Sequence, residues 1–425
     1  MRLIAFSIFC VLIFWKSCKT NPAYLMVLLI FMYFFYPEKY IWSIEEYRIV
    51  LLLNAALIIA VLIRYKTLSI YNDRYSVLMI LLAGSFFLSA IYATMDSRIA
   101  MDGAMQFIKA VVFWIMLKNI LSKDIRNVDL FLWACMVSLS LLALWGVQQY
   151  YLGNIRLEDF GGPQIEGSNQ LASAFIWGLP IAYYKAFGET GWKRYACFGC
   201  LIILLMGIIF TESRQAFLAL VFYGVCFFVV TRKKMFYVTA ALVAALAVLP
   251  FVPSSYWDRM GSIGEYSQDA SASGRLEMWS AAVEIFADHP VLGVGPDNFI
   301  LIARYYVGLG QHVRVTHNTI MQILSEQGII GISIFCVLIF YTLRGLWRLS
   351  REQAEHGSQS NPLSYYSLAM LVSLAGVLVC SLFQNKADHE FLYWPAAVAA
   401  ALESLRQRIS EKTTDQHGEI LQLNG

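Results

Sequence analysis

Long apolar segments alternate with short polar turns along most of the chain. A membrane-spanning helix needs roughly 20 apolar residues, within a range of about 17–25. Twelve segments fit or approach this range, and the shorter segment Leu3–Trp15 would make a thirteenth. The expected spans are Pro22–Tyr36, Arg48–Ile63, Tyr75–Met95, Ala104–Leu121, Val128–Leu152, Asn169–Phe187, Tyr195–Thr211, Gln215–Thr231, Met235–Val252, Thr319–Leu343, Leu363–Phe383 and Phe391–Leu405. The pattern predicts an all-α polytopic membrane protein with about 12 transmembrane helices.

One polar stretch, residues 253–318, is much longer than the other turns. Its apolar residues recur at intervals of three and four, which predicts an amphipathic helix that Ser273 caps and Pro290 ends. The expected apolar stripe consists of Leu276, Trp279, Val283 and Phe286. Such a helix would lie flat, with its stripe in the membrane interface or on the helical bundle. The expected parts of the chain are an N-terminal bundle (1–252), this loop (253–318), C-terminal membrane helices (319–408) and a polar cytoplasmic tail (409–425).

The composition agrees with a membrane protein. The chain has 425 residues, of which 59% are hydrophobic and 14% charged, whereas soluble domains have about 45–50% and about 25%. The net charge is only +3, and no basic run lies outside the membrane segments, so a nucleic-acid partner is not expected. Membrane lipids are the expected surroundings. Cys197 and Cys200 have the spacing of a metal or redox pair, but small residues one helical turn apart are the favoured interpretation.

Lys and Arg collect in alternate connections, and the cytoplasmic loops of membrane proteins carry an excess of these residues. The basic connections contain Lys16/Lys19, Arg64/Lys66/Arg74, Lys118/Lys123/Arg126, Lys193/Arg194, Arg232/Lys233/Lys234, Arg344/Arg348/Arg351 and Arg406/Arg408/Lys412. The connections between them are mixed or acidic, such as Asp96–Asp102 and Lys386–Glu390. This alternation predicts a cytoplasmic C-terminus. It also places the polar loop and the short turn Thr211–Arg214 on the same outer face.

Three side chains stand at helix ends on this expected outer face. Arg214 begins a span, where an arginine is costly, so it is either an anion ligand or an interfacial anchor. Arg275 lies in the first turn of the expected loop helix and opposes the helix dipole, so it is either an anion ligand or a solvated charge. His317 precedes a helix N-terminus that disfavours imidazole protonation, so it either acts as a neutral base or bonds the loop.

Other polar residues of the same region are further candidates. Asn318 is expected to cap the next span, and Arg304 and Arg314 add positive charge to the loop, where they could contact an anionic substrate. Glu326 lies about 12 Å along that span and shares a face with Gln322. A carboxylate at such a depth has either an internal partner or a functional role, and an internal bond is the favoured interpretation.

Metal and nucleotide chemistry find little support in the sequence. The turn Asp388-His389-Glu390 could hold a cation, but one three-residue cluster is weak evidence. The chain lacks the acidic pairs of metal-dependent glycosyltransferases and any phosphate-binding glycine loop, so we expect no metal and no cofactor. Two arginines and a histidine at helix ends suit a substrate with an apolar tail and an anionic head, such as a polyprenyl diphosphate. A neutral histidine could then activate an attacking hydroxyl.

Three stretches of the chain resemble the O-antigen ligase and polymerase superfamily of bacterial envelope enzymes. They are Thr211-Glu-Ser-Arg214-Gln-Ala, then Ser273-Gly-Arg275-Leu-Glu-Met-Trp279 with His289-Pro-Val-Leu-Gly-Val-Gly-Pro296, and Thr316-His317-Asn318-Thr-Ile-Met-Gln-Ile-Leu-Ser-Glu326-Gln-Gly328-Ile-Ile-Gly331. They cover about residues 200–340, and their order and the layout of spans make the resemblance fairly specific.

This resemblance implies a GT-C-like fold and a metal-independent, inverting glycosyltransferase on the periplasmic face of the bacterial inner membrane. The family's ligases transfer a glycan from undecaprenyl diphosphate to a sugar hydroxyl of lipid A–core, which builds lipopolysaccharide. Carried over to this chain, Arg214 and Arg275 would bind the diphosphate leaving group, and His317 would deprotonate the acceptor. No departure from the family pattern is evident at these three positions.

Other functions stay open at this stage. An O-antigen polymerase or a protein O-oligosaccharyltransferase of the same superfamily would share donor and fold and differ in acceptor. The outer loops carry no added soluble domain, which favours a lipid acceptor over a protein acceptor. A transporter or flippase would place charges or helix breaks near the bilayer midplane in paired halves, and the sequence shows no such repeat.

Overall fold

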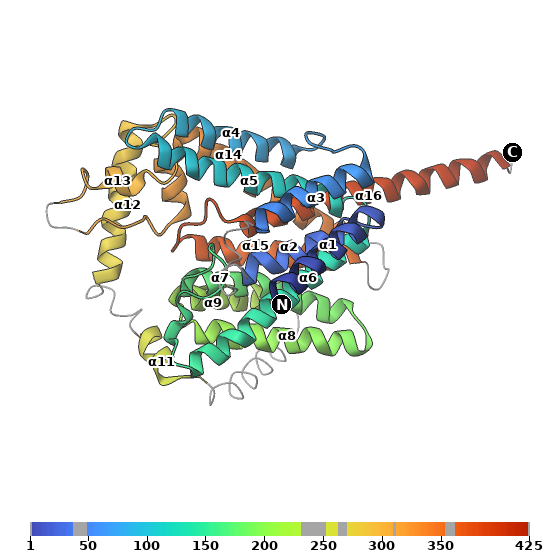
Figure 1. Cartoon of the computed structure of the whole chain (residues 1–425), viewed down its shortest axis with the longest axis horizontal. Coiled ribbons are helices and arrows are strands. Elements are labelled where there is room, and N and C mark those ends of the chain that lie inside the picture. Colours follow the sequence, from blue (N-terminus) through green and yellow to red (C-terminus); the bar gives the residue numbers. More distant parts are fainter. Residues whose placement is uncertain are drawn as a thin grey trace.

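The computed structural model describes residues 2–36, 49–230, 252–261, 270–308, 312–352 and 362–423, and all regular structure in these ranges is helical (Figure 1). The helices are α1 (Arg2–Lys19), α2 (Ala23–Phe35), α3 (Ile49–Tyr65), α4 (Arg74–Ile91), α5 (Ser97–Leu121), α6 (Ile125–Tyr151), η3 (Ile155–Leu157), α7 (Ser168–Gly188), α8 (Gly191–Phe210), α9 (Arg214–Val230), α11 (Ser254–Gly261), α12 (Ala270–Asp288), α13 (Phe299–Ala303), α14 (Thr319–Glu352), α15 (Pro362–Ser381) and α16 (Glu390–Leu423).

Each expected span within the described ranges coincides with one of these helices. Six helices of the described ranges are long and apolar enough to cross a bilayer, namely α4, α5, α6, α8, α14 and α15. Helices α2, α3 and α9 are shorter apolar helices. The expected span Met235–Val252 falls almost wholly outside the described residues. The architecture is therefore that of a multi-pass membrane protein, and the count of about 12 spans stays a prediction.

The bundle has two distinct ends (Figure 1). Helices α11, α12 and α13 lie at one end, which we call the loop end, and the C-terminal part of α16 extends from the opposite end. The described connections expected to be basic meet at the opposite end. Lys118 Nζ there lies 2.9 Å from the Asp73 carboxylate, and Arg408 Nη1 donates to the Ser122 carbonyl at 2.9 Å. The grouping of connections thus follows the alternation of Lys and Arg along the chain.

Close helix packing depends on small residues at the crossing points, as is usual for membrane bundles. Gly376 of α15 faces the Tyr223 hydroxyl of α9, and a Cβ at position 376 would overlap it. That hydroxyl lies 3.2 Å from the carbonyl oxygen of Ile176 on α7 and 3.1 Å from that of Val372 on α15, and shares its one proton between them. The Tyr223 hydroxyl therefore joins α7, α9 and α15, and it can do so because residue 376 is a glycine.

Helix α12 runs across the loop end instead of along the bundle (Figure 1). The predicted start of this helix was wrong, whereas the exposure of its predicted stripe fits the alternative that the stripe lies in the membrane interface. The helix already includes Ala270, so Ser273 is not its N-cap and Arg275 lies beyond its first turn. Leu276 and Val283 of the expected stripe are 48% and 49% exposed.

The buried face of α12 consists instead of small and medium apolar residues. Met278, Ala282 and Ile285 pack against Val294, Phe299, Ile302 and Ala303, which form a separate small core under the loop. Because α12 is apolar on two faces, its spacing admits two stripes, and the segment after α12 determines which one is buried. The Ala-Ser-Ala start also fits a helix, so no residue forces the start at Ser273.

Candidate active site

The start of α14 fixes His317 in an unusual backbone conformation. Asn318 caps this helix, as expected, because its Oδ1 accepts from the backbone N–H groups of Ile320 at 2.9 Å and Met321 at 3.2 Å. His317 has φ of 47°, in the left-handed region that non-glycine residues rarely adopt. Such strain costs on the order of 1–3 kcal/mol and is concentrated at functional sites. The Asn318 cap and the left-handed backbone together fix the His317 imidazole just before the N-terminus of α14.

The surroundings of His317 favour its neutral form. Burial, with the positive charges of Arg275 and Arg314, lowers the pKa of the His317 imidazole below its ordinary value. The imidazole is consequently neutral at pH 7 and able to accept a proton. The structure thus brings Arg275 and Arg314 near His317. Arg304 lies at the exposed end of α13, with its guanidinium 5.1 Å from the Tyr305 ring.

Two of the three stretches that resemble the superfamily, residues 289–296 and 316–331, are joined by backbone hydrogen bonds. The backbone N–H groups of Val294 and Gly295 donate to the carbonyls of Ser325 and Glu326, both at 3.0 Å. Helix α14 is interrupted at Gly328, which has φ of 63° and ψ of −161°. A Cβ at Gly293 would lie 2.4 Å from the Glu326 carbonyl carbon. These glycines let the two backbones touch, so the loop is anchored on the helix that follows His317.

Gly293→Ala is expected to destabilise this anchor, because the new methyl group would overlap backbone at a left-handed position. We expect a lower Tm in detergent, equivalent to at least about 1–3 kcal/mol, with loss of activity. Gly199→Ala is the matched control, since a Cβ at Gly199 on α8 would meet open space. Equal Tm values for the two variants would contradict the anchor.

Glu326 has internal partners. Its side chain is 3% exposed, and its carboxyl accepts from the backbone N–H of Asp297 and from the side chain of Gln322. Its carbonyl oxygen accepts from Ser89 Oγ of α4 at 2.6 Å. This agrees with the favoured expectation of an internal bond. Glu326 thus holds residues of the polar loop and α4 to α14.

Arg214, the first residue of α9, belongs to a second cluster at the loop end. Ser213 Oγ donates to the Asn169 Oδ1 at 2.7 Å, and Gln215 Nε2 donates to the Asn169 carbonyl at 2.8 Å. The turn that carries Arg214 is therefore tied to the start of α7. Glu212 in the same turn has φ of 50°, a second strained residue beside a candidate site residue.

Two further arginines, which the sequence did not single out, lie near Arg214. Burial and the charges of Arg156 and Arg214 lower the pKa of the Arg259 guanidinium. Ser255, one helical turn before Arg259 on α11, donates from Oγ to Glu212 Oε1 at 2.5 Å. This hydrogen bond places α11 beside the turn that carries Arg214.

Arg156 comes from the loop around η3. Its Nη2 donates to Ser168 Oγ at 3.0 Å, at the start of α7, and lies 3.1 Å from Glu158 Oε1. The cluster of Arg156, Arg214 and Arg259 thus forms from three segments that are distant in sequence. Each arginine lies in a connection expected on the outer face, but their proximity to one another is evident only from the three-dimensional structure.

The turn between α15 and α16 joins the Arg214 cluster to His317. Asn385 Oδ1 accepts from Thr316 Oγ1 at 2.8 Å and from the Asn318 backbone N–H at 3.2 Å, on either side of His317. The adjacent Lys386 donates from Nζ to Ser173 Oγ at 2.5 Å. Ser173 lies one helical turn after Asn169, which holds the Arg214 turn. We call residues 384–389 the bridging turn, because it connects the two halves of the site.

Lys386 is completely buried in the bridging turn. Burial lowers the pKa of its ammonium group to about 7, and its Nζ lies 4.4 Å from the centre of the Phe391 ring. The sequence indicated only a cluster Asp388-His389-Glu390 in this turn. Within the described ranges, no group of three or more His, Cys, Asp or Glu side chains is arranged to hold a metal ion.

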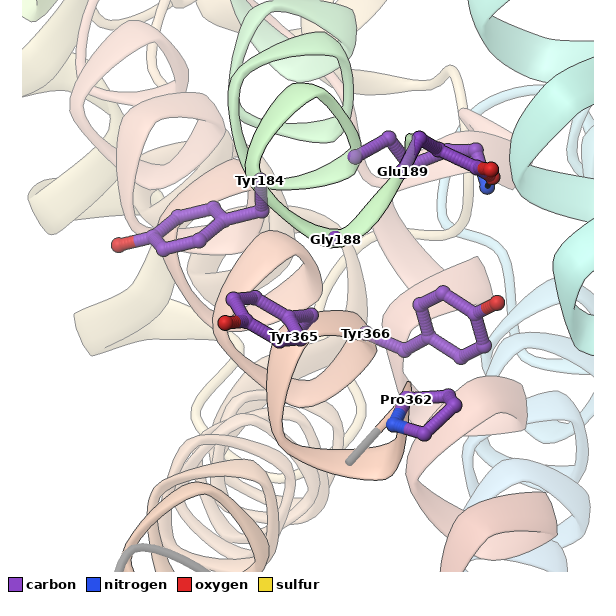
Figure 2. A pocket seen from close by; sticks show the side chains of 7 residues that line it. Tyr184, Gly188, Glu189, Pro362, Tyr365 and Tyr366 are labelled. Atoms are coloured by element: carbon purple, nitrogen blue, oxygen red, sulfur yellow. Dashed lines mark hydrogen bonds and ion pairs between the residues drawn. The ribbon is translucent and has the colours of Figure 1, made fainter. Parts of the chain in front are cut away.

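A small cavity at the opposite end is unsuitable for a glycan substrate. It has a volume of about 50 Å³ and lies where the end of α7 meets the start of α15. Figure 2 shows Tyr365 and Tyr366 of α15 beside the turn at Gly188. Lys185 at this cavity is 2.5 Å from Asp129 and 3.0 Å from Glu189, so its charge is balanced within the bundle.

The fold and the site define a multi-pass membrane protein with a cationic and histidine-bearing site at one end. Residues 199–336 match the model of a family described as O-antigen ligase. This segment includes Arg214, Arg275, His317 and Glu326. The resemblance to the O-antigen ligase superfamily, indicated by the motifs, is confirmed.

Curated relatives agree with this match. A protein of Rickettsia conorii, provisionally named polysaccharide ligase, is 24% identical over 200 residues, covering 43% of this chain and 47% of the relative. One of Rickettsia typhi with the same provisional name is 24% identical over 226 residues, covering 50% of this chain and 54% of the relative. The chain therefore spans about half the length of the curated relatives it matches.

Proposed function

We propose that the protein is an O-antigen ligase, which transfers a glycan from undecaprenyl diphosphate to a sugar hydroxyl of lipid A–core. The family match and the relatives support ligase-type glycan transfer as the class of activity. The observation that carries the proposal is the joining of two half-sites by the bridging turn. One half supplies arginines for an anionic leaving group, and the other supplies a neutral histidine.

In the proposed reaction, the acceptor hydroxyl gives its proton to the His317 imidazole as its oxygen attacks the anomeric carbon. The bond between that carbon and the diphosphate oxygen breaks, and its electron pair leaves with the diphosphate. Arg214 and Arg275 neutralise the developing charge, since guanidinium groups bind phosphate oxygens in pairs. A single displacement inverts the anomeric configuration, and none of these steps requires a metal or cofactor.

The proposal places the loop end on the periplasmic face of the bacterial inner membrane. The opposite end, with its basic connections, would face the cytoplasm. The donor would then reach the site with its polyprenyl tail in the bilayer. Helix α12 lies across this end and exposes Leu276 and Val283, which suit contact with lipid or with the substrate tail.

The test is a deletion strain examined for surface polysaccharide and carrier-bound glycan. A ligase predicts loss of attached glycan while polymer accumulates on the carrier lipid. Attachment of single repeat units would instead indicate an O-antigen polymerase. If a protein becomes under-glycosylated while lipopolysaccharide is unchanged, the protein O-oligosaccharyltransferase alternative is correct.

The proposed base also predicts a pH dependence. Since Arg314 lowers the pKa of His317, Arg314→Gln should raise that pKa and move the acidic limb of kcat/KM to higher pH. A pH–rate profile of purified protein measures the shift. Arg304→Gln removes the same charge from the exposed end of α13 and should leave the limb in place. Identical profiles for Arg314→Gln and wild type would argue against His317 as the titrating base.

A further inference from the structure

A polar cavity of about 630 Å³ opens at the opposite end of the bundle, away from the proposed active site. Its walls come from the connection before α4, from the C-terminal ends of α5 and α14, and from the middle of α16. The cationic side chains that line it are Arg74, Lys118, Lys123, Arg348 and Arg408. Volumes of about 300–1,000 Å³ are typical of sites for small molecules. The cavity is therefore large enough for a ligand of headgroup size.

The cavity has more positive than negative charge. Its two carboxylates are Asp73 and Glu403. Asp73 is engaged by Lys118 at 2.9 Å and also caps α4 through the Ser76 backbone N–H. Lys118 is 2% exposed and forms part of the interior.

Glu403 is shared by two arginines. Arg74 Nη2 lies 2.6 Å from Glu403 Oε1, and Arg348 Nη2 lies 2.9 Å from the same oxygen. Lys123 and Arg408 stand on the exposed side of the cavity. Lys123 Nζ lies 4.8 Å from the centre of the Tyr65 ring, and Arg408 bonds a backbone carbonyl. The five cationic side chains of the cavity therefore outnumber its two carboxylates, which leaves positive charge to bind an anion.

The polar lining suits an anion with several oxygen acceptors. Ser69, Asn72, Ser404 and Gln407 add hydroxyl and amide groups to the wall. Arginine forks bind phosphate oxygens in bidentate fashion, and lysine binds them as a point charge. Basic pockets between the cytoplasmic ends of membrane helices commonly receive anionic lipid headgroups.

We propose that this cavity binds a phosphate-bearing anion, taken from the headgroup of an anionic phospholipid or from free phosphate compounds. Its walls belong to α4, α5, α14 and α16, so the bound anion would tie these helices together. Glu326 and Ser89 join α4 and α14 at the other end of the bundle. The site is separate from the proposed active site, and the proposal does not depend on glycan transfer.

The test measures binding to the purified full-length protein in neutral detergent. Phosphatidylglycerol, phosphatidylcholine and inorganic phosphate are added separately, and native mass spectrometry and Tm are recorded. We expect phosphatidylglycerol to bind and to raise Tm more than phosphatidylcholine does. A comparable effect of inorganic phosphate alone would identify the free anion as the source. Equal effects of both lipids, with no effect of phosphate, would overturn the proposal.

Lys123→Gln combined with Arg408→Gln is the variant for this test, because both side chains are exposed and their loss leaves no buried partner. Its affinity for the anion should fall at least about tenfold. Lys193→Gln combined with Arg194→Gln removes the same charge outside the cavity and should bind normally. If both variants lose affinity equally, binding reflects general surface charge and the cavity proposal is wrong. If the first variant does not fold, Arg408→Gln alone is compared with Arg194→Gln.

Discussion

Replacing His317 with alanine is expected to abolish glycan transfer while donor binding survives. The His317 imidazole is a titratable group that the site keeps neutral, because burial and two nearby arginines lower its pKa. Loss of a general base costs about 10²–10⁴-fold in rate. The measurement is transfer from lipid-linked glycan to lipid A–core by purified protein, with donor binding determined separately.

Two companion variants separate chemistry from folding. Asparagine tolerates the left-handed backbone at φ of 47° but cannot act as a base, so His317→Asn should be folded and equally inactive. His312→Ala removes an exposed histidine of the same loop and should retain transfer. If His317→Asn transfers glycan at more than about a tenth of the wild-type rate, His317 is not the base that the proposed mechanism requires.

The spans and their grouping at two ends could be predicted from sequence, because both depend on local composition. A bilayer selects long apolar segments, and Lys and Arg mark alternate connections. The helix cap at Asn318 is equally local and was confirmed. The stripe on α12 was not predictable in the same way. Which face of α12 is buried depends on Val294, Phe299 and neighbouring residues. These follow the helix in sequence and form a core against the face that does not carry the predicted stripe.

The candidate site was only partly visible in the sequence. Arg214, Arg275 and His317 could be selected because each stands near a helix end on one expected face. Arg156 and Arg259 escaped selection, since their meeting with Arg214 depends on contacts between distant segments. Their position in outer connections was the only available signal.

The bridging turn illustrates the same limit. Lys386 and Asn385 look like ordinary polar residues of a short turn. Their importance follows from hydrogen bonds to Ser173 on α7 and to the residues flanking His317. The bond at Ser173 spans 213 positions in the sequence, and no local pattern reports a contact over such a separation.

Arg214→Gln should lower kcat/KM for the lipid-linked donor by about 10²–10³-fold, because removing a preorganised group that stabilises developing charge has effects of this size. The change should leave the fold intact, since Ser213 and Gln215 hold the turn through Asn169. Arg259→Gln should reduce kcat/KM less, because Arg214 and Arg156 remain to hold the anion. Arg194→Gln, at the opposite end, serves as the control for a lost surface charge.

The comparison of these variants also tests how the cationic cluster works. The three arginine charges outnumber those of the nearby Glu158 and Glu212, so a bound diphosphate would balance the remaining positive charge. Wild-type protein should therefore gain thermal stability from added donor, whereas Arg214→Gln should gain little. If Arg259→Gln loses more activity than Arg214→Gln, the diphosphate is centred on α11 instead of the α9 N-terminus. If both variants keep wild-type kcat/KM and donor-induced stabilisation, the cluster has a structural role and the donor must bind elsewhere.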